Sequence, residues 1–307
     1  MYLQKAKPFL KWAGGKTQLI NDIDRLLPRN LFTRKFSYVE PFVGSGAVLF
    51  WILDKFPHLE KIVINDINED LINTYRVIAA QPKELITVLC EFQENYHALH
   101  GEQGKKETYY YEKRILYNSR VTENVMQAAL FIFLNKTCFN GLYRVNQKNH
   151  FNVPIGSYKK PTICNAENIY AVSAALRQVE ILCGDYEDTL EKTGQHSFFY
   201  FDPPYKPLSS TSSFNSYAQH VFNDAEQIRL RDFCRKLETR GHQWLLSNSD
   251  PKIQGTNQTF FDDIYANFRI LRVKASRRIN SNAEKRGELN ELLIANYEHE
   301  KTLRVIV

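Results

Sequence analysis

The tetrapeptide Asp202-Pro203-Pro204-Tyr205 has the clearest potential for chemistry in this 307-residue sequence. It follows residues 197–201, an apolar run that predicts a buried strand, and catalytic loops lie at the carboxyl ends of such strands. The two prolines fix the backbone and withhold two N–H donors, so the loop offers acceptors, namely the Asp202 carboxylate and nearby carbonyls. Paired prolines also occur in ordinary turns, and it is the flanking Asp202 and Tyr205 that favour a site.

An amino group on a planar ring is the chemical partner that this loop suits. The lone pair of such an amine is delocalised into the ring, which makes the nitrogen a poor nucleophile. Acceptors that hold its two hydrogens favour the tetrahedral nitrogen that forms during attack, so no strong base is needed beforehand. Tyr205 can stack on the ring face, a contact worth roughly 1–3 kcal/mol per base.

A glycine-containing turn at residues 40–46 predicts a nucleoside site. Gly44 and Gly46 follow a predicted strand and allow a sharp turn and the close approach of a ligand. Asp66 comes twenty residues after Gly46, at the end of the next predicted strand, where an acid can accept hydrogen bonds from ribose hydroxyls. Two alternatives stay open: a tight turn without a ligand, and Asp66 as a cap of the following helix. Leu49 replaces the third glycine of the dinucleotide fingerprint, and no hydride-transfer acid or base stands out, which disfavours a dehydrogenase.

The segment 9–17 contains Gly-Lys-Thr, which is typical of phosphate-binding loops. That motif requires a glycine where Leu10 stands, and no hydrophobic strand precedes the segment, so a nucleotide triphosphatase is rejected. Packing of Trp12 at the start of a helix remains an alternative to a ligand contact.

Alternating strand and helix patterns predict a doubly wound, mostly parallel α/β sheet. Seven strands are expected, at residues 37–43, 61–65, 179–183, 197–201, 243–247, 268–273 and 291–296, with helices at 47–56, 68–80 and 224–238. Residues 84–135 read as helices, including 125–134, and residues 136–165 form a loop-rich stretch, which in a compact domain is usually functional. We therefore predict a catalytic domain from residues 1–80 and 166–307, interrupted by an insert at 81–165.

Bulk composition limits the class of protein. Lys and Arg number 40 against 34 Asp and Glu, and the resulting charge of +6 suits a polyanionic partner without requiring one. Five scattered cysteines without a CxxC or His-rich cluster indicate neither a disulfide framework nor a metal site, so a cytoplasmic location is expected. The longest apolar run is too short to span a membrane.

Eight motifs, in family order along nearly the whole chain, resemble those of the Dam-like, alpha-class (D12-class) adenine-N6 DNA methyltransferases. They are FLKWAGGK at 9–16, EPFVGSG at 40–46, NDIN at 65–68, FNGLYRVN at 139–146, FNVP at 151–154, GSYKKP at 156–161, DPPY at 202–205 and SSFNSY at 212–217. The resemblance implies a class I S-adenosylmethionine-dependent methyltransferase fold. It also implies methyl transfer from S-adenosyl-L-methionine to N6 of an adenine that has been flipped out of double-stranded DNA.

The resemblance further implies roles for individual residues. Cofactor contacts are expected from Trp12, Lys16, Phe42, Gly44, Gly46, Asp66, Asp185, Tyr186 and Asp202, with Asp66 at the ribose and Asp185 and Tyr186 at the adenine ring. Catalysis is expected from Asp202, Pro203, Pro204 and Tyr205. DNA contacts are expected from Lys11, Phe139, Asn140, Leu142, Arg144, Pro154 and Tyr158 within a target-recognition insert.

Within this insert, Arg144 is expected to read a guanine, worth ~1–3 kcal/mol of discrimination, and Phe139 to wedge where a base leaves the stack. The alternative for Arg144 is a solvated basic side chain. Residues 209–217 resemble a flap over the flipped base, and phosphate contacts are expected from Arg277, Arg278 and Lys285. Members with LYRVN-like and FNVP-like segments methylate the adenine of GATC, which becomes the expected target.

Two departures from the family pattern bear on DNA contacts. Ser157 stands where close relatives usually have arginine, and residues 280–284 stand where relatives tend to be glycine-rich. Two other functions stay open: methylation of an RNA base or a protein amide nitrogen, where Asn often replaces the residue at Asp202, and DNA binding without catalysis. A cognate restriction endonuclease that need not bind directly is a compatible partner.

Overall fold

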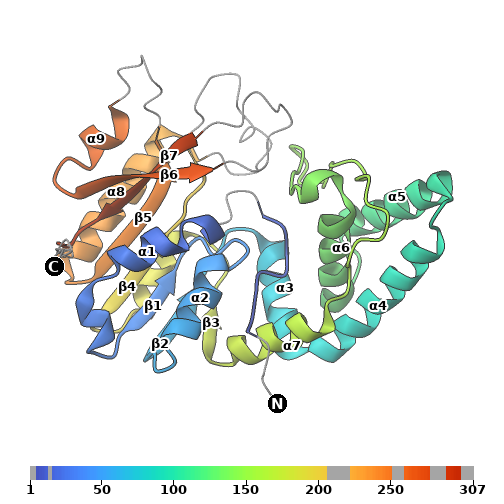
Figure 1. Cartoon of the computed structure of the whole chain (residues 1–307), viewed down its shortest axis with the longest axis horizontal. Coiled ribbons are helices and arrows are strands. Elements are labelled where there is room, and N and C mark those ends of the chain that lie inside the picture. The colour runs from blue at the N-terminus through green and yellow to red at the C-terminus, as the bar shows by residue number, and fades with distance from the viewer. Residues whose placement is uncertain (1–4, 13–15, 206–221, 251–258, 277–287, 299–307) are drawn as a thin grey trace, which may run out of the picture.

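The computed structural model describes residues 5–12, 16–205, 222–250, 259–276 and 288–298. These form a seven-stranded sheet in the order β3-β2-β1-β4-β5-β7-β6, in which β7 runs antiparallel to both of its neighbours and the other pairs are parallel (Figure 1). The strands are β1 (Ser37–Glu40), β2 (Lys61–Ile64), β3 (Val179–Ile181), β4 (Ser197–Phe201), β5 (Gln243–Ser249), β6 (Arg269–Ser276) and β7 (Glu288–Ala295). The predicted mostly parallel seven-stranded sheet is confirmed.

Two strands end at least two residues earlier than their apolar runs predict. We expected β1 to reach residue 43, but it ends at Glu40, because Pro41 has no N–H to donate and the N–H of Val43 bonds the carbonyl of Asn65. Strand β3 ends at Ile181 rather than at residue 183.

Alternate residues along the strands face two separate cores, as expected for a sheet covered on both sides. Tyr38 and Phe198 face α1 (Ile20–Leu26), α2 (Ala47–Lys55) and α3 (Glu69–Ala80). Val39 and Phe199 face the opposite core, formed with α8 (Asp224–Thr239) and α9 (Phe260–Ile264). Every residue of β4 is buried, which explains its unbroken apolar sequence. Short 3₁₀ helices lie at η1 (Lys16–Gln18), η2 (Arg29–Phe32), η3 (Phe139–Gly141), η4 (Leu176–Gln178) and η5 (Tyr186–Lys192).

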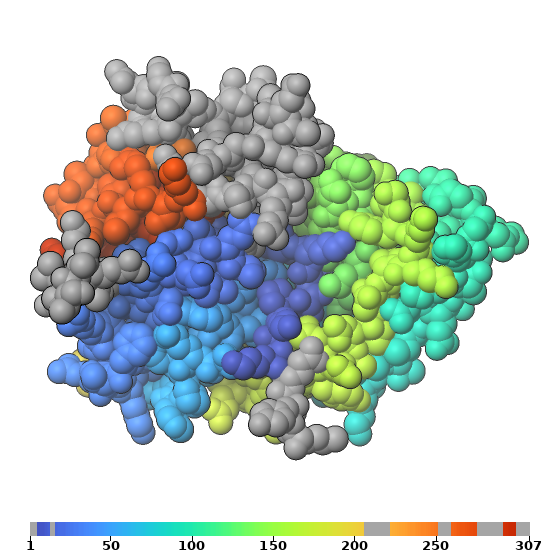
Figure 2. Space-filling model, in the orientation of Figure 1, coloured from blue at the N-terminus to red at the C-terminus, as the bar shows by residue number. Residues whose placement is uncertain are grey.

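Beside the sheet lies a part that we call the helical module: α4 (Pro82–Ala98), α5 (Gln103–Ser119), α6 (Asn124–Thr137) and residues 138–165 (Figure 1). Helix α6 is its centre, because it packs on α3, α4 and α5 and its apolar run 128–134 is buried. Helix α7 (Ala166–Ala175) leads the chain back to the sheet and packs on α3 and α4. Residues 5–12 run along the seam between sheet and module (Figure 2), where the N–H of Lys7 bonds the side chain of Asn168 and the N–H of Lys11 bonds that of Asn135.

The sheet order places the site. Strands β1 and β4 pair in parallel, with Ser37 opposite Ser197 and Val39 opposite Phe199, so their carboxyl ends meet at one edge. From β1 the strand order runs one way through β2 and β3, and from β4 it runs the other way through β5. Ligands of doubly wound sheets bind where the order reverses in this manner. The glycine turn after β1 and the 202–205 loop after β4 are therefore neighbours.

Candidate active site

Asp202 has a defined electrostatic environment at the end of β4. Its Oδ1 lies 2.9 Å from the Lys16 ammonium and accepts a hydrogen bond of 3.2 Å from the Ser247 hydroxyl. The contacts that the described residues make with this carboxylate all fall on Oδ1. Burial raises the pKa of Asp202 above its ordinary value, although Lys16 opposes the shift by favouring the ionised form.

Lys16 joins the 202–205 loop to β7. Its side chain is 3% exposed, its ammonium is also 3.7 Å from Glu291 Oε2, and it hydrogen-bonds the hydroxyl of Tyr205. That hydroxyl in turn donates to Glu291 Oε2 at 2.8 Å. The ammonium is thus shared by two carboxylates, and the Tyr205 ring is held 4.2 Å from it.

Two carbonyls near the loop already accept hydrogen bonds within the protein. The Pro204 carbonyl accepts one of 3.1 Å from Gln227, and the Phe201 carbonyl accepts one of 3.2 Å from Ser247. Among the described residues, no donor is directed at the Pro203 carbonyl or at Asp202 Oδ2. These two oxygens therefore have their full capacity to accept hydrogen bonds from a ligand.

The glycine turn needs its glycines for two reasons. Gly44 and Gly46 have φ values of +49° and +75°, in the left-handed region that side chains disfavour. A Cβ on Gly44 would lie 3.1 Å from the Trp12 indole, and one on Gly46 would lie 2.5 Å from the Tyr75 hydroxyl. The turn is thus closely packed on the side of α3 and Trp12.

Asp66 is held in place by the backbone. Its Oδ2 accepts the N–H of Gly44 at 3.1 Å and its Oδ1 accepts that of Asn68 at 3.0 Å. Asn68, not Asp66, caps α3, because its side chain accepts the N–H of Leu71. Burial raises the pKa of Asp66 to about 6, although these backbone hydrogen bonds lower it. Asp66 therefore links the glycine turn to the end of β2, and the two backbone N–H groups fix the orientation of its carboxylate.

Asp185 and Tyr186 lie beyond β3, where Arg229 of α8 fixes both. Arg229 donates two hydrogen bonds of 2.8 Å to the Asp185 carboxylate, and its guanidinium lies 4.9 Å from the Tyr186 ring centroid. Burial would raise the pKa of Asp185, but the hydrogen bonds from Arg229 and from the Glu187 N–H lower it on balance. The rings of Tyr186 and Phe42 are 5.3 Å apart, so they form one aromatic wall.

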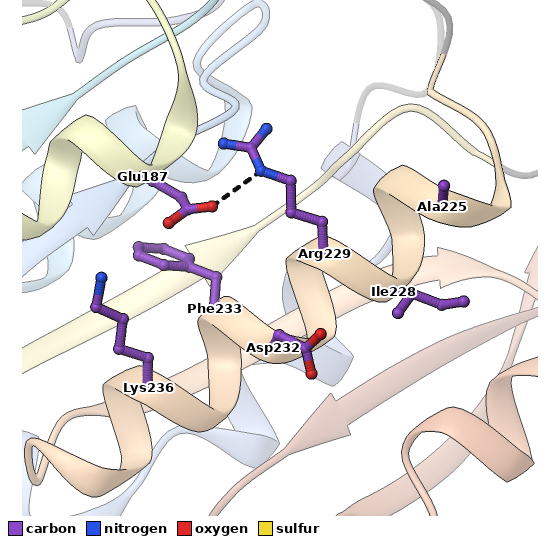
Figure 3. A pocket seen from close by; sticks show the side chains of 7 residues that line it. All are labelled: Glu187, Ala225, Ile228, Arg229, Asp232, Phe233 and Lys236. Carbon is purple, nitrogen blue, oxygen red and sulfur yellow. Dashed lines mark ion pairs between the residues drawn. The ribbon is translucent and has the colours of Figure 1, made fainter.

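A cavity of about 320 Å³ borders this region on the outer side of α8 (Figure 3). Arg229 pairs with Glu187 at 2.9 Å on one side of it, and Phe233 and Lys236 of α8 also line it. Its lining contains neither Asp202 nor the glycine turn, so this cavity is distinct from the predicted cofactor site.

Trp12 connects the sheet with the helical module. Its indole stacks on Tyr143, with ring centroids 5.5 Å apart and planes inclined by 20°, and it meets Phe131 of α6 edge-on. The side chain of Asn135 brackets the backbone of Lys11, accepting from its N–H and donating to its carbonyl, both at 2.8 Å. Trp12 therefore has a packing role, and a cofactor role for it stays a prediction.

The structure gathers several of the predicted DNA-contacting residues. Phe139 is 46% exposed, and its N–H bonds the carbonyl of the exposed Pro154 at 2.9 Å. Asn140, the next residue, has a φ of +54°. Lys11 extends along this turn, and its ammonium lies 4.0 Å from the Tyr158 ring centroid. These residues form a surface that carries the exposed Phe139 ring, the Lys11 ammonium and the Tyr158 ring.

Arg144 is a held side chain, unlike the solvated residue of the alternative. Its Nε donates to the side-chain oxygen of Asn152 at 2.6 Å, and its Nη2 donates to the Asn152 carbonyl at 3.2 Å. Leu142, two residues earlier, is half-buried against the core.

Some predicted features lie outside the described residues: the flap at 209–217, the segment 280–284, and Arg277, Arg278 and Lys285. Ser157 is exposed. Neither a metal-binding cluster of three or more His, Cys, Asp or Glu nor a helix able to cross a membrane is found in the part of the chain that is described.

Sequence reasoning missed three residues of the site. Ser247, Glu291 and Arg229 come from β5, β7 and α8, and each contacts a predicted site residue at a sequence separation of 44 or more. Ser247 carries a signal that could have found it, because it ends the predicted strand 243–247, whose carboxyl end lies beside that of β4. No local pattern marks Glu291 or Arg229, which became part of the site through the strand order and the packing of α8.

Comparisons with known proteins agree with this geometry. Residues 12–279 match the family described as D12 class N6 adenine-specific DNA methyltransferase. The type II methyltransferase M.MjaIII of Methanocaldococcus jannaschii is 48% identical over 297 residues, which cover 95% of this chain and 100% of that protein. The DNA adenine methylase of Haemophilus influenzae is 35% identical over 290 residues, covering 94% of this chain and 93% of that protein.

The sheet order and the site at its reversal point define a class I S-adenosylmethionine-dependent methyltransferase fold. The chain belongs to the D12 class N6 adenine-specific DNA methyltransferase family and is an enzyme that methylates adenine in DNA. The family match favours this activity over the RNA, protein-amide and non-catalytic alternatives.

Proposed function

We propose that this enzyme transfers a methyl group from S-adenosyl-L-methionine to N6 of the adenine in 5'-GATC-3' of double-stranded DNA, after that adenine has rotated out of the duplex. The observation that carries the proposal is the arrangement at the sheet edge. There the Asp202 carboxylate, engaged by Lys16 and Ser247 on one oxygen only, lies at the strand next to the glycine turn and Asp66.

The residues around the glycine turn fit the cofactor. The positive φ values of Gly44 and Gly46 form the tight turn after β1, and the Asp66 carboxylate is held at the end of β2, where ribose hydroxyls can donate to it. The Phe42 and Tyr186 rings offer an apolar wall for an adenine ring beside Asp185. When bound, the cofactor supplies a methyl group on a positively charged sulfur.

Asp202 and the Pro203 carbonyl hold the amino group of the target adenine. Two fixed acceptors draw the lone pair of N6 out of the ring as the new N–C bond forms, and one N–H proton is released from that nitrogen. The Lys16 ammonium favours the ionised form of Asp202, which burial disfavours, and as a carboxylate Asp202 can accept the amino hydrogens and then the proton. Tyr205, held by Glu291, supplies the ring on which the base stacks.

Residues 81–165 act in this proposal as the target-recognition module, and residues 1–80 and 166–307 as the catalytic domain. Arg144, aligned by Asn152, reads a guanine, and the exposed Phe139 fills the space left by the rotated base. Asn140, Leu142, Pro154, Lys11 and Tyr158 complete the DNA-contacting surface. Two similar proteins are named type II methyltransferases, which supports a role beside a restriction endonuclease that need not bind directly.

The direct test is methylation of two matched duplexes, one with a single 5'-GATC-3' and one in which a single base pair is exchanged, so that 5'-GTTC-3' pairs with 5'-GAAC-3'. With labelled S-adenosylmethionine, label should appear as N6-methyladenine in the first duplex and be about 10-fold or more lower in the second, as expected for one changed base pair worth ~1–3 kcal/mol. Label in another nucleoside would refute the reaction, and equal label in both duplexes would refute the target sequence.

The Asp202→Ala variant should keep DNA affinity and lose turnover by about 100-fold or more, as expected when a transition-state acceptor is removed. The matched control is Asp232→Ala, since Asp232 is an exposed carboxylate on α8, 58% exposed and outside the site. If the Asp202→Ala variant turned over like the control, the catalytic assignment would fail.

A further inference from the structure

Two thiols from distant parts of the chain meet in the helical module. Cys90 lies on α4 and Cys164 lies just before α7, and their sulfurs are 3.1 Å apart. Both side chains are partly exposed, and neither belongs to the site around Asp202. A disulfide has its sulfurs about 2.0 Å apart, so a movement of roughly 1 Å brings these two to bonding distance.

The contact between the two sulfurs is one of a series that holds residues 161–164 along α4. Cys90, Gln93 and His97 occupy positions i, i+3 and i+7 and so share one face of the helix. Gln93 Oε1 accepts the N–H groups of residues 163 and 164 at 2.9 and 3.1 Å, and His97 Nε2 is 2.9 Å from the carbonyl of residue 161. The neighbouring contacts therefore keep the two sulfurs in register.

We propose that Cys90 and Cys164 are a modification site: a thiol pair that closes to a disulfide on reaction with a small-molecule disulfide and reopens with a thiol reductant. The geometry distinguishes this pair from the other three cysteines. Cys138 and Cys234 are buried, and no sulfur partner lies near Cys183 among the described residues.

The reaction is a balanced thiol–disulfide exchange. One cysteine of the pair loses its proton to solvent, and its thiolate attacks one sulfur of the small disulfide, which forms a mixed disulfide and releases one small thiolate. That small thiolate takes the proton of the second cysteine, whose sulfur then attacks the sulfur of the first and expels the second small thiolate, which takes up a proton from solvent. Two electrons pass from the cysteines to the oxidant, which leaves as two thiols.

Closure would join positions 74 residues apart and enclose α5, α6 and the segment that bears Phe139 and Arg144. A cross-link over a long loop stabilises a protein mainly by restricting its unfolded chain. We therefore expect the oxidised form to melt several degrees higher than the reduced form, by roughly 5 °C or more for a domain of this size.

The test is oxidation of the folded, full-length enzyme with oxidised glutathione, followed by acid quenching, denaturation and alkylation of free thiols. The wild type should fall from five alkylated cysteines to three, and peptide mapping should find the peptides of Cys90 and Cys164 joined. The Cys90→Ser and Cys164→Ala variants should form no internal cross-link and show no rise in Tm. The matched control Cys183→Ser should behave like the wild type, and dithiothreitol should reverse both changes.

Persistence of five free thiols, or a cross-link between other cysteines, would overturn the assignment of the pair. A cross-linked protein with an unchanged Tm would overturn the stabilising role. Both variants lie away from Asp202 and the glycine turn, so their circular dichroism and their methylation rate report independently that they have folded.

Discussion

At the scale of single residues, burial and Lys16 have opposite effects on the charge state of the Asp202 carboxylate. Burial and the nearby Glu291 carboxylate favour the neutral form of Asp202, and the Lys16 ammonium at 2.9 Å favours the ionised form. Lys16 itself is buried and also contacts Glu291, so the three side chains form one charge system. Removal of the Lys16 charge should therefore raise the pKa of Asp202, and removal of the Glu291 charge should lower it.

This opposition gives a prediction for the pH dependence of kcat/KM. Activity requires ionised Asp202, so it should fall on the acidic side as the carboxylate becomes protonated. Lys16→Met should move this acidic limb to higher pH because it removes the attraction, and Glu291→Gln should move it to lower pH because it removes a repulsion. The measurement is the pH–rate profile of each variant, and a shift in the same direction for both would contradict the assignment.

Asp66 provides a second pH-dependent step, in cofactor binding. Because burial raises its pKa to about 6, the carboxylate is ionised above that pH and protonated below it. A protonated Asp66 accepts fewer hydrogen bonds from ribose hydroxyls, so the Kd for S-adenosylmethionine should rise as pH falls through about 6, by up to tenfold per unit for one proton. Calorimetric titrations from pH 5 to 8 would show this, and Asp66→Asn should bind weakly with little pH dependence. An equal dependence in both proteins would assign the titration to another group.

At the scale of elements, the turn between β1 and α2 depends on the space around its second glycine. Gly46 and Gly241 have similar φ values, +75° and +78°, but a Cβ on Gly46 would lie 2.5 Å from the Tyr75 hydroxyl, and one on Gly241 meets nothing within 4 Å. Alanine substitutions at these two glycines therefore separate the cost of a left-handed backbone from the cost of a steric clash.

Gly241→Ala should cost about 1–2 kcal/mol of the free energy of unfolding, from the left-handed backbone alone. Gly46→Ala should cost roughly 1–3 kcal/mol more, because Tyr75 is fully buried on α3 and its ring cannot move freely. Urea unfolding of both variants measures the difference. Equal losses would show that the turn relaxes around the added methyl group.

The stacked pair of Trp12 and Tyr143 connects the cofactor side of the enzyme with the segment that bears Arg144. Tyr143 also contacts Phe131 edge-on. The segment that bears Arg144 is thus in direct contact with Trp12, one of the predicted cofactor residues.

Tyr143→Leu should raise the KM for S-adenosylmethionine roughly 2- to 10-fold, since an aromatic pair is worth about 0.5–1.5 kcal/mol. Tyr143→Phe keeps the stack and should change this KM less than the leucine variant does. Phe139→Leu, at an exposed ring away from Trp12, should leave it unaltered and raise the KM for DNA instead. Leucine and phenylalanine variants with the same KM for the cofactor would exclude a role for the stack.

At the scale of the whole molecule, a polar network joins the sheet to the helical module. Asp70 of α3 is 8% exposed, accepts a hydrogen bond of 2.6 Å from Tyr117 of α5, and pairs with Arg120, which follows α5. Gln127 of α6 donates to the same carboxylate at 3.4 Å. One carboxylate thus satisfies donors from three parts of the module.

Asp70→Ala should destabilise the protein by roughly 2–4 kcal/mol, somewhat less than the loss of one partner of a fully buried ion pair, because Arg120 is about a third exposed. Chemical unfolding provides the measurement, with the exposed Asp232→Ala as control. A loss no larger than that of the control would show that the module docks by apolar packing alone.

The sequence by itself determined the local features of the site. The apolar run before Asp202 and the period of the strands and helices depend on neighbouring residues, and β4, α2 and α8 lie where these patterns predict them. Gly44 and Gly46 are likewise local, because their positive φ values favour residues without a Cβ.

Only the tertiary structure decided which distant residues complete the site. Because β7 enters the sheet antiparallel, it is the beginning of this strand, with Glu291 opposite Ser249, that reaches the edge where β1 and β4 end. Reasoning from carboxyl strand ends could not find Glu291 for that reason. Ser247 ends the predicted strand 243–247, but its contact with Asp202 depends on β5 lying next to β4, and Arg229 reaches Asp185 through the packing of α8. Chain connectivity sets the order of the elements, whereas the burial of both sheet faces sets which side chains meet.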